Sequence, residues 1–303
     1  MSTRTTSPTN LRPAEAAAGA GGAGGVGGAA DGRLSFAAMV EHLGAILGTD
    51  LSGATPASNL RDDLGWDSLT MVEVLGLLDR YGVTLPEELL GELHTLGDVH
   101  HHVAFHAAGR SPDTAALPAV ADPFLGPNVR LLPITAPDQD YLYRLMGTGR
   151  HLVSYRMRGA TPGPERFSHF LWDQVLAQFL VTTHEGRMLG LVSSFEPDFR
   201  NRYAYLAAVA DPAFEQSGLV LEGLALLVSY LFAEFDLRKL YAESLESNFA
   251  QFASGADRVF DVEGRLREHE YIHGAYQDYV IAAVWRDRWR AHHQRILGTE
   301  PPF

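Results

Sequence analysis

Two stretches without a regular apolar pattern divide this chain of 303 residues into two units. Residues 1–32 are mostly alanine, glycine and small polar residues, which lack the bulky side chains that offset the entropy of ordering a chain. Residues 109–127 contain four prolines and show no helical or strand period, which is typical of a semi-extended linker. We therefore predict a disordered tail over residues 1–32, a domain over 33–108, a linker over 109–127, a second domain over 128–290 and a tail over 291–303.

Apolar residues recur at helical spacing in the first unit, over residues 34–47 and 68–80, and glycines end both patterns. A short helix over 86–90 and another over 96–107, with Thr95 at its N-cap, would complete a four-helix, all-α bundle. The bundle is acidic, because residues 34–108 hold eleven Asp and Glu against two Arg, a balance of −9.

Ser68 stands between Asp67 and Leu69 in the first turn of the second predicted helix. Asp and Ser are ordinary N-cap residues, so either of them could simply accept a backbone N–H. A catalytic serine fits less well, since no Gly-x-Ser-x-Gly motif surrounds it. A third interpretation comes from the whole motif Leu64-Gly65-Trp66-Asp67-Ser68-Leu69, together with Thr95-Leu96-Gly97-Asp98-Val99 at the start of the last helix. On these motifs residues 33–108 resemble acyl carrier proteins.

The resemblance implies that Ser68 carries a phosphopantetheine arm through a phosphodiester, a modification that makes the chain a phosphoprotein. A phosphodiester at a helix N-terminus meets unpaired N–H groups and the positive end of the helix dipole. The implied partner is a phosphopantetheinyl transferase. Glu73 and Asp79 on the same helix would be docking charges for basic patches on partner enzymes, unless they only solvate a surface face.

Composition narrows the chemistry that the chain can perform. It has no cysteine, which excludes disulfides and zinc–thiolate sites, and we predict no metal site. The sulfur for any thioester must therefore come from outside the sequence, and the thiol at the end of the arm would supply it. A formal charge of −13 disfavours nucleic acids and anionic membranes as partners. The N-terminus lacks a signal-peptide pattern and no apolar run approaches about 18 residues, so we expect a cytoplasmic protein.

Alternating and apolar runs in the second unit predict strands interleaved with helices. We expect strands over residues 129–134, 176–183, 188–195, 203–209, 237–245, 259–272 and 278–284, and helices over 137–146, 167–175, 219–235 and 247–254. His184-Glu185-Gly186-Arg187 supplies the turn of an antiparallel hairpin. This order favours the α/β class, with helices covering a mixed sheet.

Two spaced motifs end the second unit. Val262-Glu263-Gly264-Arg265-Leu266-Arg267 is followed by Gly274, Tyr276, Asp278 and then Trp285-Arg286-Asp287-Arg288-Trp289. With the order of elements, these residues make positions 128–290 resemble the GNAT superfamily of N-acyltransferases, in particular its ribosomal-protein N-terminal acetyltransferase branch. The resemblance implies a GNAT fold with a mixed, largely antiparallel sheet.

The resemblance also implies a loop, before the long helix over 219–235, that binds the diphosphate of coenzyme A through backbone N–H groups. Its usual pattern is Gln/Arg-x-x-Gly-x-Gly/Ala, but this chain has Glu215-Gln216-Ser217-Gly218-Leu219-Val220, so only Gly218 remains. A glutamate and a β-branched valine both act against a diphosphate. We therefore favour an acyl donor held on the arm of Ser68, with acyl-coenzyme A as the competing donor.

By the same resemblance, the thioester carbonyl lies near Ala207 and Val209, where neighbouring strands part and backbone N–H groups can polarise it. Candidates for the base are Glu243, Glu246, Tyr205 and Glu196. Asn248 begins the next helix, which reads Asn-Phe-Ala-Gln-Phe and lacks the Tyr or Ser that often serves the superfamily as an acid. Gly218 and Asn248 are, with Ala207 and Val209, the predicted cofactor-binding residues of this domain.

These features predict a bifunctional carrier–acyltransferase of natural-product biosynthesis, of polyketide or nonribosomal type, that moves an acyl group between the thioester on Ser68 and a small amine acceptor. Acyl-loading ligase or synthase modules would be further partners. Three alternatives remain open. The second domain acylates an aminoacyl group on the carrier from acyl-coenzyme A, it loads the carrier from acyl-coenzyme A, or it is a non-catalytic docking domain.

Overall fold

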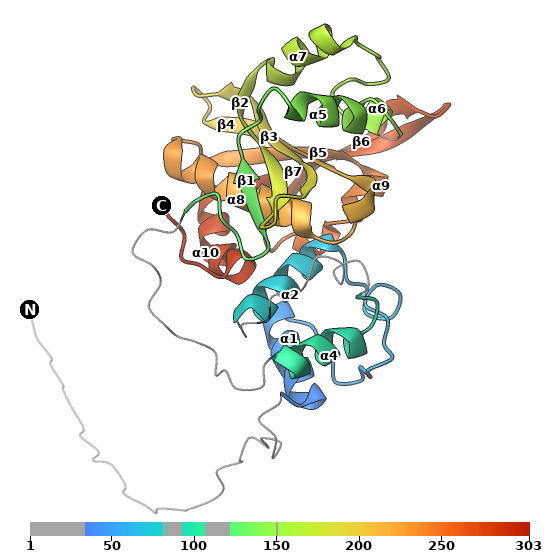
Figure 1. Ribbon diagram of the computed structural model, residues 1–303, viewed down its shortest axis with the longest axis vertical. Coiled ribbons are helices and arrows are strands. Elements are labelled where there is room, and N and C mark those ends of the chain that lie inside the picture. Colours follow the sequence, from blue (N-terminus) through green and yellow to red (C-terminus); the bar gives the residue numbers. More distant parts are fainter. Residues whose placement is uncertain (1–33, 81–82, 84–92, 107–121, 150) are drawn as a thin grey trace, which may run out of the picture.

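The computed structural model describes residues 34–303 except 81–82, 84–92, 107–121 and 150 (Figure 1). The N-terminal helices form one lobe, and a seven-stranded sheet with its covering helices forms the other (Figure 1). The class predicted from the sequence, an all-α carrier bundle followed by an α/β domain with a largely antiparallel sheet, is confirmed.

The helices of the N-terminal lobe begin and end at the expected signals. They are α1 (Phe36–Leu47), α2 (Ser68–Arg80) and α4 (Leu96–His106). Ser35 caps α1 by accepting the N–H of Ala38, and Gly48 ends it in the left-handed conformation. Thr95 and Asp98 cap α4 reciprocally, since each side chain accepts the backbone N–H of the other. The short helix expected over residues 86–90 lies outside the described residues.

Apolar side chains of these helices meet in one core, which includes Met39, Leu43, Leu75 and Val99, all at most 2% exposed. The core continues without a break into side chains of the C-terminal lobe. The two lobes therefore share buried apolar surface, which stabilises their docked arrangement.

The C-terminal sheet has the order β1-β2-β3-β4-β5-β7-β6. Its strands are β1 (Val129–Leu132), β2 (Val175–Thr183), β3 (Met188–Asp198), β4 (Tyr203–Ala210), β5 (Lys239–Leu245), β6 (Asp261–Ile272) and β7 (Ala275–Trp285). Every neighbouring pair is antiparallel except β4 and β5, which run parallel. The parallel pair requires a crossover, and α8 (Leu219–Glu234) supplies it.

Helices cover both faces of the sheet. On one face lie α5 (Asp138–Met146), α6 (His151–Ser154) and α7 (Pro164–Trp172), and on the other lie α8 and α10 (Arg286–Leu297) (Figure 1). Alternate residues of a strand serve opposite faces, so Leu180 packs with the α5 and α7 side while Val181 packs with the α8 side. A short α9 (Glu246–Phe249) and two single turns, η1 (Pro212–Phe214) and η2 (Ala253–Gly255), complete the lobe.

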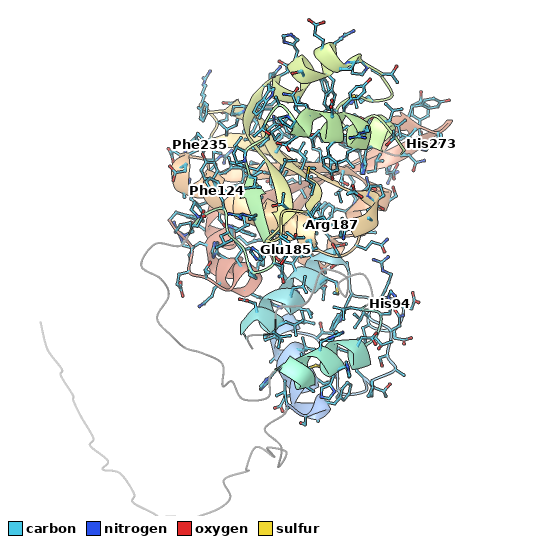
Figure 2. The ribbon with its side chains drawn as sticks, viewed as in Figure 1. His94, Phe124, Glu185, Arg187, Phe235 and His273 are labelled. Atoms are coloured by element: carbon cyan, nitrogen blue, oxygen red, sulfur yellow. The ribbon has the colours of Figure 1, made fainter. Side chains whose placement is uncertain are left out.

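The boundaries of the second domain differ from those expected. Residues 291–303, expected to form a tail, instead extend α10 and return to the core, where Phe303 packs on Phe232 at 5.9 Å between ring centres. The described end of the expected linker also joins this lobe, since Phe124 packs against Phe179 and Tyr230 (Figure 2). The sequence pattern did not predict the polar helix α10, because its apolar residues are few and widely spaced.

We predict that Ile296→Ala lowers the free energy of unfolding by about 2–5 kcal/mol, because Ile296 is 1% exposed and its loss leaves a cavity. Gln294→Ala, at an exposed position of the same helix, is the control and should change it by less than about 0.5 kcal/mol. Urea unfolding followed by tryptophan fluorescence measures both values. Equal effects of the two substitutions would mean that the end of the chain is a tail after all.

Candidate active site

The parallel strands β4 and β5 separate part-way along their length. They pair only as far as Leu206 and Ala242, whereas β4 stays paired with β3, and β5 with β7, to the ends of both strands. At residues 207–209, the edge of β4 on the side of β5 therefore faces an opening, while the other edge remains paired with β3. Small alanine side chains at positions 207 and 208 leave this opening unfilled.

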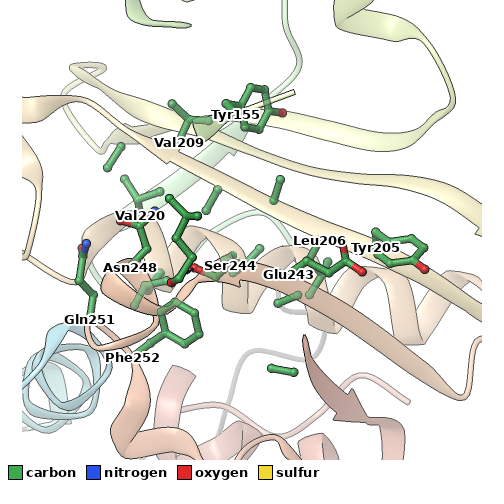
Figure 3. Close-up of a pocket in the computed structure, with 18 of the residues that line it drawn as sticks. Tyr155, Tyr205, Leu206, Val209, Val220, Glu243, Ser244, Asn248, Gln251 and Phe252 are labelled. Carbon is green, nitrogen blue, oxygen red and sulfur yellow. Dashed lines mark hydrogen bonds between the residues drawn. The ribbon is translucent and has the colours of Figure 1, made fainter. Parts of the chain in front are cut away.

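A cavity of about 690 Å³ occupies the opening, a volume within the range of roughly 300–1,000 Å³ usual for small-molecule sites. Ala207 and Val209, the residues predicted to lie near a thioester carbonyl, line this cavity. Figure 3 shows Glu243 and Tyr205 close together at one end of the cavity, and Gln251 and Phe252 at the end next to α2. The cavity thus connects the sheet opening with the N-terminal lobe.

Acidic and phenolic side chains gather at the far end of this cavity, where Glu243, Glu196, Tyr205 and Tyr279 all line the wall. Burial raises the pKa of Glu243, and the negative charge of Glu196 raises it further. Burial and the charge of Glu243 also raise the pKa of both tyrosines, to about 12 for Tyr279. At neutral pH the tyrosines therefore keep their protons, and Glu243 is the better proton acceptor.

Two predicted site residues belong to α9, and the structure separates them. Asn248 lines the cavity together with Gln251. Glu246, a candidate base, lies outside the group that meets at the cavity, because its carboxylate pairs with Arg265 of β6 and about half of its side chain is exposed. Ser244, two residues before Glu246, does line the cavity.

Ser68 lines the same cavity from the N-terminal lobe. Its backbone N–H donates to the carbonyl of Gln251 at 3.0 Å, which fixes the first turn of α2 against the loop after α9. The residue is only 5% exposed, yet its Oγ has no hydrogen-bond partner among the described residues. A buried hydroxyl without a partner is costly, so its position at the cavity wall points to a function other than folding.

Asp67, and not Ser68, is the N-cap of α2. One carboxylate oxygen accepts the N–H and the hydroxyl of Thr70, both at 3.0 Å. The carboxylate also accepts the N–H of Ser254 at 2.9 Å and its hydroxyl at 2.7 Å, and Ser254 belongs to the C-terminal lobe. The cap therefore doubles as a contact between lobes and leaves the serine hydroxyl uncommitted.

Gly218, predicted to bind the diphosphate of coenzyme A, lies directly beneath Ser68. It has φ +83°, a conformation that favours glycine, and a Cβ there would stand 2.8 Å from the carbonyl oxygen of Ser68 and 3.1 Å from the N of Val72. The first turn of α2 thus covers the start of α8. In this arrangement the loop before α8 faces the N-terminal lobe instead of open solvent.

Glu73 anchors the middle of α2 to the C-terminal lobe. Its carboxylate is fully buried and pairs with Arg258, which follows η2, and with Arg295 of α10 at 3.0 Å. Burial raises the pKa of Glu73, and the two guanidinium groups offset part of that effect. We expected Glu73 and Asp79 to meet basic patches of other enzymes. Glu73 meets its own chain, while Asp79 is exposed.

Sequence reasoning missed the partners of α2, which are Gln251, Ser254, Arg258 and Arg295. They join positions as far apart as 222 residues, so no local pattern relates them to α2. The negative charge of α2 was a signal that could have indicated such partners, because an acidic helix that is to be buried needs basic residues against it.

Comparisons with known proteins separate the two lobes. Residues 37–103 match the family model described as "Phosphopantetheine attachment site". A stretch of 64 residues is 42% identical to the meromycolate extension acyl carrier protein of Mycolicibacterium aurum, covering 21% of this chain and 66% of that protein. Another stretch, of 170 residues, is 23% identical to spermidine N(1)-acetyltransferase of Escherichia coli strain K12, covering 55% of this chain and 91% of that protein. By these matches the N-terminal lobe is similar to phosphopantetheine carrier proteins, and the C-terminal lobe is similar to an N-acetyltransferase.

Solved structures of N-acetyltransferases are similar to about half of the chain. Spermidine N-acetyltransferase from Vibrio cholerae, in complex with CoA and spermine, is 20% identical with a TM-score of 0.47 and covers 53% of this chain and 97% of its own. The ribosomal L7/L12 alpha-N-protein acetyltransferase RimL, in complex with coenzyme A, is 19% identical with the same TM-score and covers 53% and 96%. Among the described residues, every helix is too short or too polar to span a bilayer.

The surroundings of Ser68 fit a phosphopantetheine arm. The unpartnered hydroxyl is available for a phosphodiester, and its position on the cavity wall gives the arm a path toward Glu243. The start of α8, beneath it, contributes the positive end of a helix dipole. Apolar side chains of α8, such as Val220 and Leu221, line the same wall.

We predict that substitutions at the two neighbouring residues at the start of α2 differ in their effect on the stability of the unmodified protein. Asp67→Ala should lower the free energy of unfolding by roughly 1–2 kcal/mol, because it removes the N-cap and the bonds to Ser254. Ser68→Ala should change it by less than about 0.5 kcal/mol, because its hydroxyl makes no bond to lose. Chemical unfolding measures both, and a large loss in Ser68→Ala would give the serine a structural role.

Proposed function

We propose that the protein transfers an acyl group from a thioester on the Ser68 arm to a small amine. The observation that carries this proposal is that Ser68 and Glu243, from different lobes, line one cavity at the place where β4 and β5 separate. The similarity to spermidine N(1)-acetyltransferase supports N-acyl transfer, and the match to the phosphopantetheine attachment family supports a covalently held donor.

When attached, the arm supplies a thioester at which an amide C–N bond forms while the C–S bond breaks, leaving the thiol on the arm. The chain's own residues prepare the partners for this exchange. Between residues 207 and 209, a backbone N–H on the edge of β4 that is not paired with β3 can stabilise charge on the carbonyl oxygen. Glu243 takes the proton that the acceptor ammonium must lose before it can attack.

A proton must also reach the departing sulfur. The related acyltransferases often place the acid, a Tyr or Ser, in the helix that corresponds to α9. No Tyr or Ser of α9 lines the cavity here, but Tyr279 of β7 does. Its raised pKa, about 12, keeps the phenol protonated at neutral pH. Tyr279 is therefore our candidate proton donor, and Tyr205, whose pKa is also raised, is a poor base that helps to orient the amine.

A donor on the arm is favoured over free acyl-coenzyme A. The arm carries the same pantetheine but not the adenosine diphosphate portion of coenzyme A, and the loop that would hold a diphosphate has lost all but Gly218 of its pattern. In the docked arrangement the Ser68 carbonyl covers Gly218, where an added Cβ would stand 2.8 Å from the carbonyl oxygen, and this hinders the approach of a diphosphate to the one residue of the pattern that remains.

The biological setting that we propose is natural-product biosynthesis, in which carriers pass acyl groups between enzymes. A phosphopantetheinyl transferase and an acyl-loading ligase or synthase module would then act before the amine is acylated. Tethering of both domains in one chain gives the arm a roughly millimolar effective concentration at the cavity, so weak docking is sufficient.

The test begins with the full chain modified by a promiscuous phosphopantetheinyl transferase and acyl-coenzyme A, which installs the acylated arm in one step. After removal of the remaining acyl-coenzyme A, a panel of amines and polyamines is added and intact-protein mass spectrometry follows the arm. We expect amine-dependent loss of the acyl mass with the arm retained, and no arm on Ser68→Ala.

Other outcomes would replace the proposal. Gain of acyl mass by the unacylated holo-protein from acyl-coenzyme A alone would indicate a loading enzyme. Acylation of an aminoacyl group placed on the arm would make the arm the acceptor. No change with any amine would indicate a non-catalytic docking domain.

The role of Glu243 gives a pH prediction. Because Glu243 must be ionised to accept a proton, transfer should rise with pH through its raised pKa, and Glu243→Gln should slow transfer by about 100-fold or more. Glu196→Gln removes a negative neighbour, which lowers the pKa of Glu243 and moves the rising limb to lower pH. If the same amine is used for every variant, the part of the pH–rate profile that reflects deprotonation of the amine stays at the same pH.

A pH–rate profile measured by mass spectrometry checks this shift, with the exposed Glu300→Gln as the matched control. If the rising limb of the Glu196→Gln profile lies at the same pH as that of the native chain, Glu243 is not the base.

A further inference from the structure

The contacts between the two lobes form one continuous surface, which we call the carrier interface. It consists of Asp67, Ser68 and Glu73 of the carrier against Gln251, Ser254, Arg258, Arg295 and Gly218 of the catalytic domain. Two further glycines allow close approach, since a Cβ at Gly76 would stand 3.1 Å from the carbonyl oxygen of Ile296, and one at Gly255 would stand 2.5 Å from Leu69 Cδ2.

This interface hides the hydroxyl that must be modified. Arm attachment forms a bond between Ser68 Oγ and phosphorus, and breaks the diphosphate P–O bond of coenzyme A. It releases adenosine 3′,5′-bisphosphate and passes the hydroxyl proton to the transferase. A second protein has to bring coenzyme A to this oxygen, but Ser68 is 5% exposed and its carbonyl rests against Gly218. The docked carrier is therefore closed to the transferase.

We propose that the carrier interface is a reversible docking surface for the chain's own carrier domain, with Glu73, Arg258 and Arg295 as a charge latch. The released carrier receives its arm and its acyl group from other proteins. The docked carrier presents the arm to the cavity, and this last part rests on the proposed function. Docking and modification compete for the same face of α2.

The composition of the latch suits reversible docking. Bringing a carboxylate and two guanidinium groups out of water costs nearly as much free energy as their attraction returns. Burial raises the pKa of Glu73 in spite of both arginines, and the Nε atoms of Arg258 and Arg295 are buried without a hydrogen-bond partner among the described residues. On release, water solvates all these groups. The latch thus selects an acidic carrier helix without making the complex permanent.

The carrier of the same chain is the occupant that the structure favours. It is seated on the surface already, and the covalent connection supplies the effective concentration that a weak contact needs. Glycines on both sides of the contact, Gly76 on the carrier and Gly218 and Gly255 on the catalytic domain, match it to the backbone of this particular helix.

The first test measures arm attachment to the full chain by a promiscuous transferase and coenzyme A, with no acyl group present. Arg258→Glu/Arg295→Glu repels Glu73 and releases the carrier, so we expect attachment to become at least about tenfold faster, equivalent to about 1.4 kcal/mol of docking free energy. Adding Glu73→Arg to this pair restores the attraction and should return the rate toward that of the native chain. Arg166→Glu, an exposed charge reversal on α7, is the control.

The second test uses the absence of native cysteine. Asp67→Cys/Ser254→Cys replaces two side chains that touch, so that one disulfide can lock the carrier in place. We expect the oxidised protein to gain no arm and the same protein to gain it after reduction, which controls for any effect of the substitution on transferase recognition. Gel filtration of the oxidised protein shows that the link lies within one chain.

Equal rates of attachment in the native chain and the Arg258→Glu/Arg295→Glu variant, or in oxidised and reduced protein, would overturn the proposal. A rate that falls as protein concentration rises would mean that a second copy occupies the interface, and would overturn the intramolecular part. Because arm attachment requires no acyl transfer, these results stand apart from the proposed function. If attachment responds to the latch while no amine is ever acylated, the interface is correct and the proposed chemistry is wrong.

Discussion

The close approach of two backbones, the first turn of α2 and the loop that precedes α8, is the constraint on which the rest of the site depends. Gly218 permits it because it has no Cβ and tolerates positive φ. The approach brings Ser68 to the wall of the cavity and covers the loop at the start of α8. A carrier serine and a sheet opening, which are remote in sequence, thereby become parts of one site.

Charge and chemistry are divided between the two ends of that site. At the carrier end, Glu73 is buried among arginines, where it holds an orientation but does no chemistry. At the other end, burial and the like charge of Glu196 raise the pKa of Glu243. In our proposal the same residue type serves docking where arginines surround it and proton transfer where a second carboxylate lies beside it.

Local sequence patterns predicted the elements well. The range 68–80 for α2, the strands beside the opening and the antiparallel hairpin all follow from apolar periods and turn residues, which act over a few positions. Gly264 coincides with a shift in the register of β6 against β7, and glycine within a strand often marks such a bulge. Residues 291–303 were misjudged because α10 owes its stability to packing on α8 and α2, and its own sequence is largely polar.

The candidate site, too, was predicted from the sequence only in part. The sequence by itself determined that Ser68 opens a helix in an acidic carrier-like bundle, and that residues 207–209 end a strand beside a long crossover helix. Only the tertiary structure decided that Asp67 is the cap, that Glu246 turns away to Arg265, and that Glu73 binds the C-terminal lobe of its own chain. The physical reason is range. Periodicity and capping depend on neighbours within about one helical turn, whereas these contacts span up to 222 residues and form only when two folded surfaces meet.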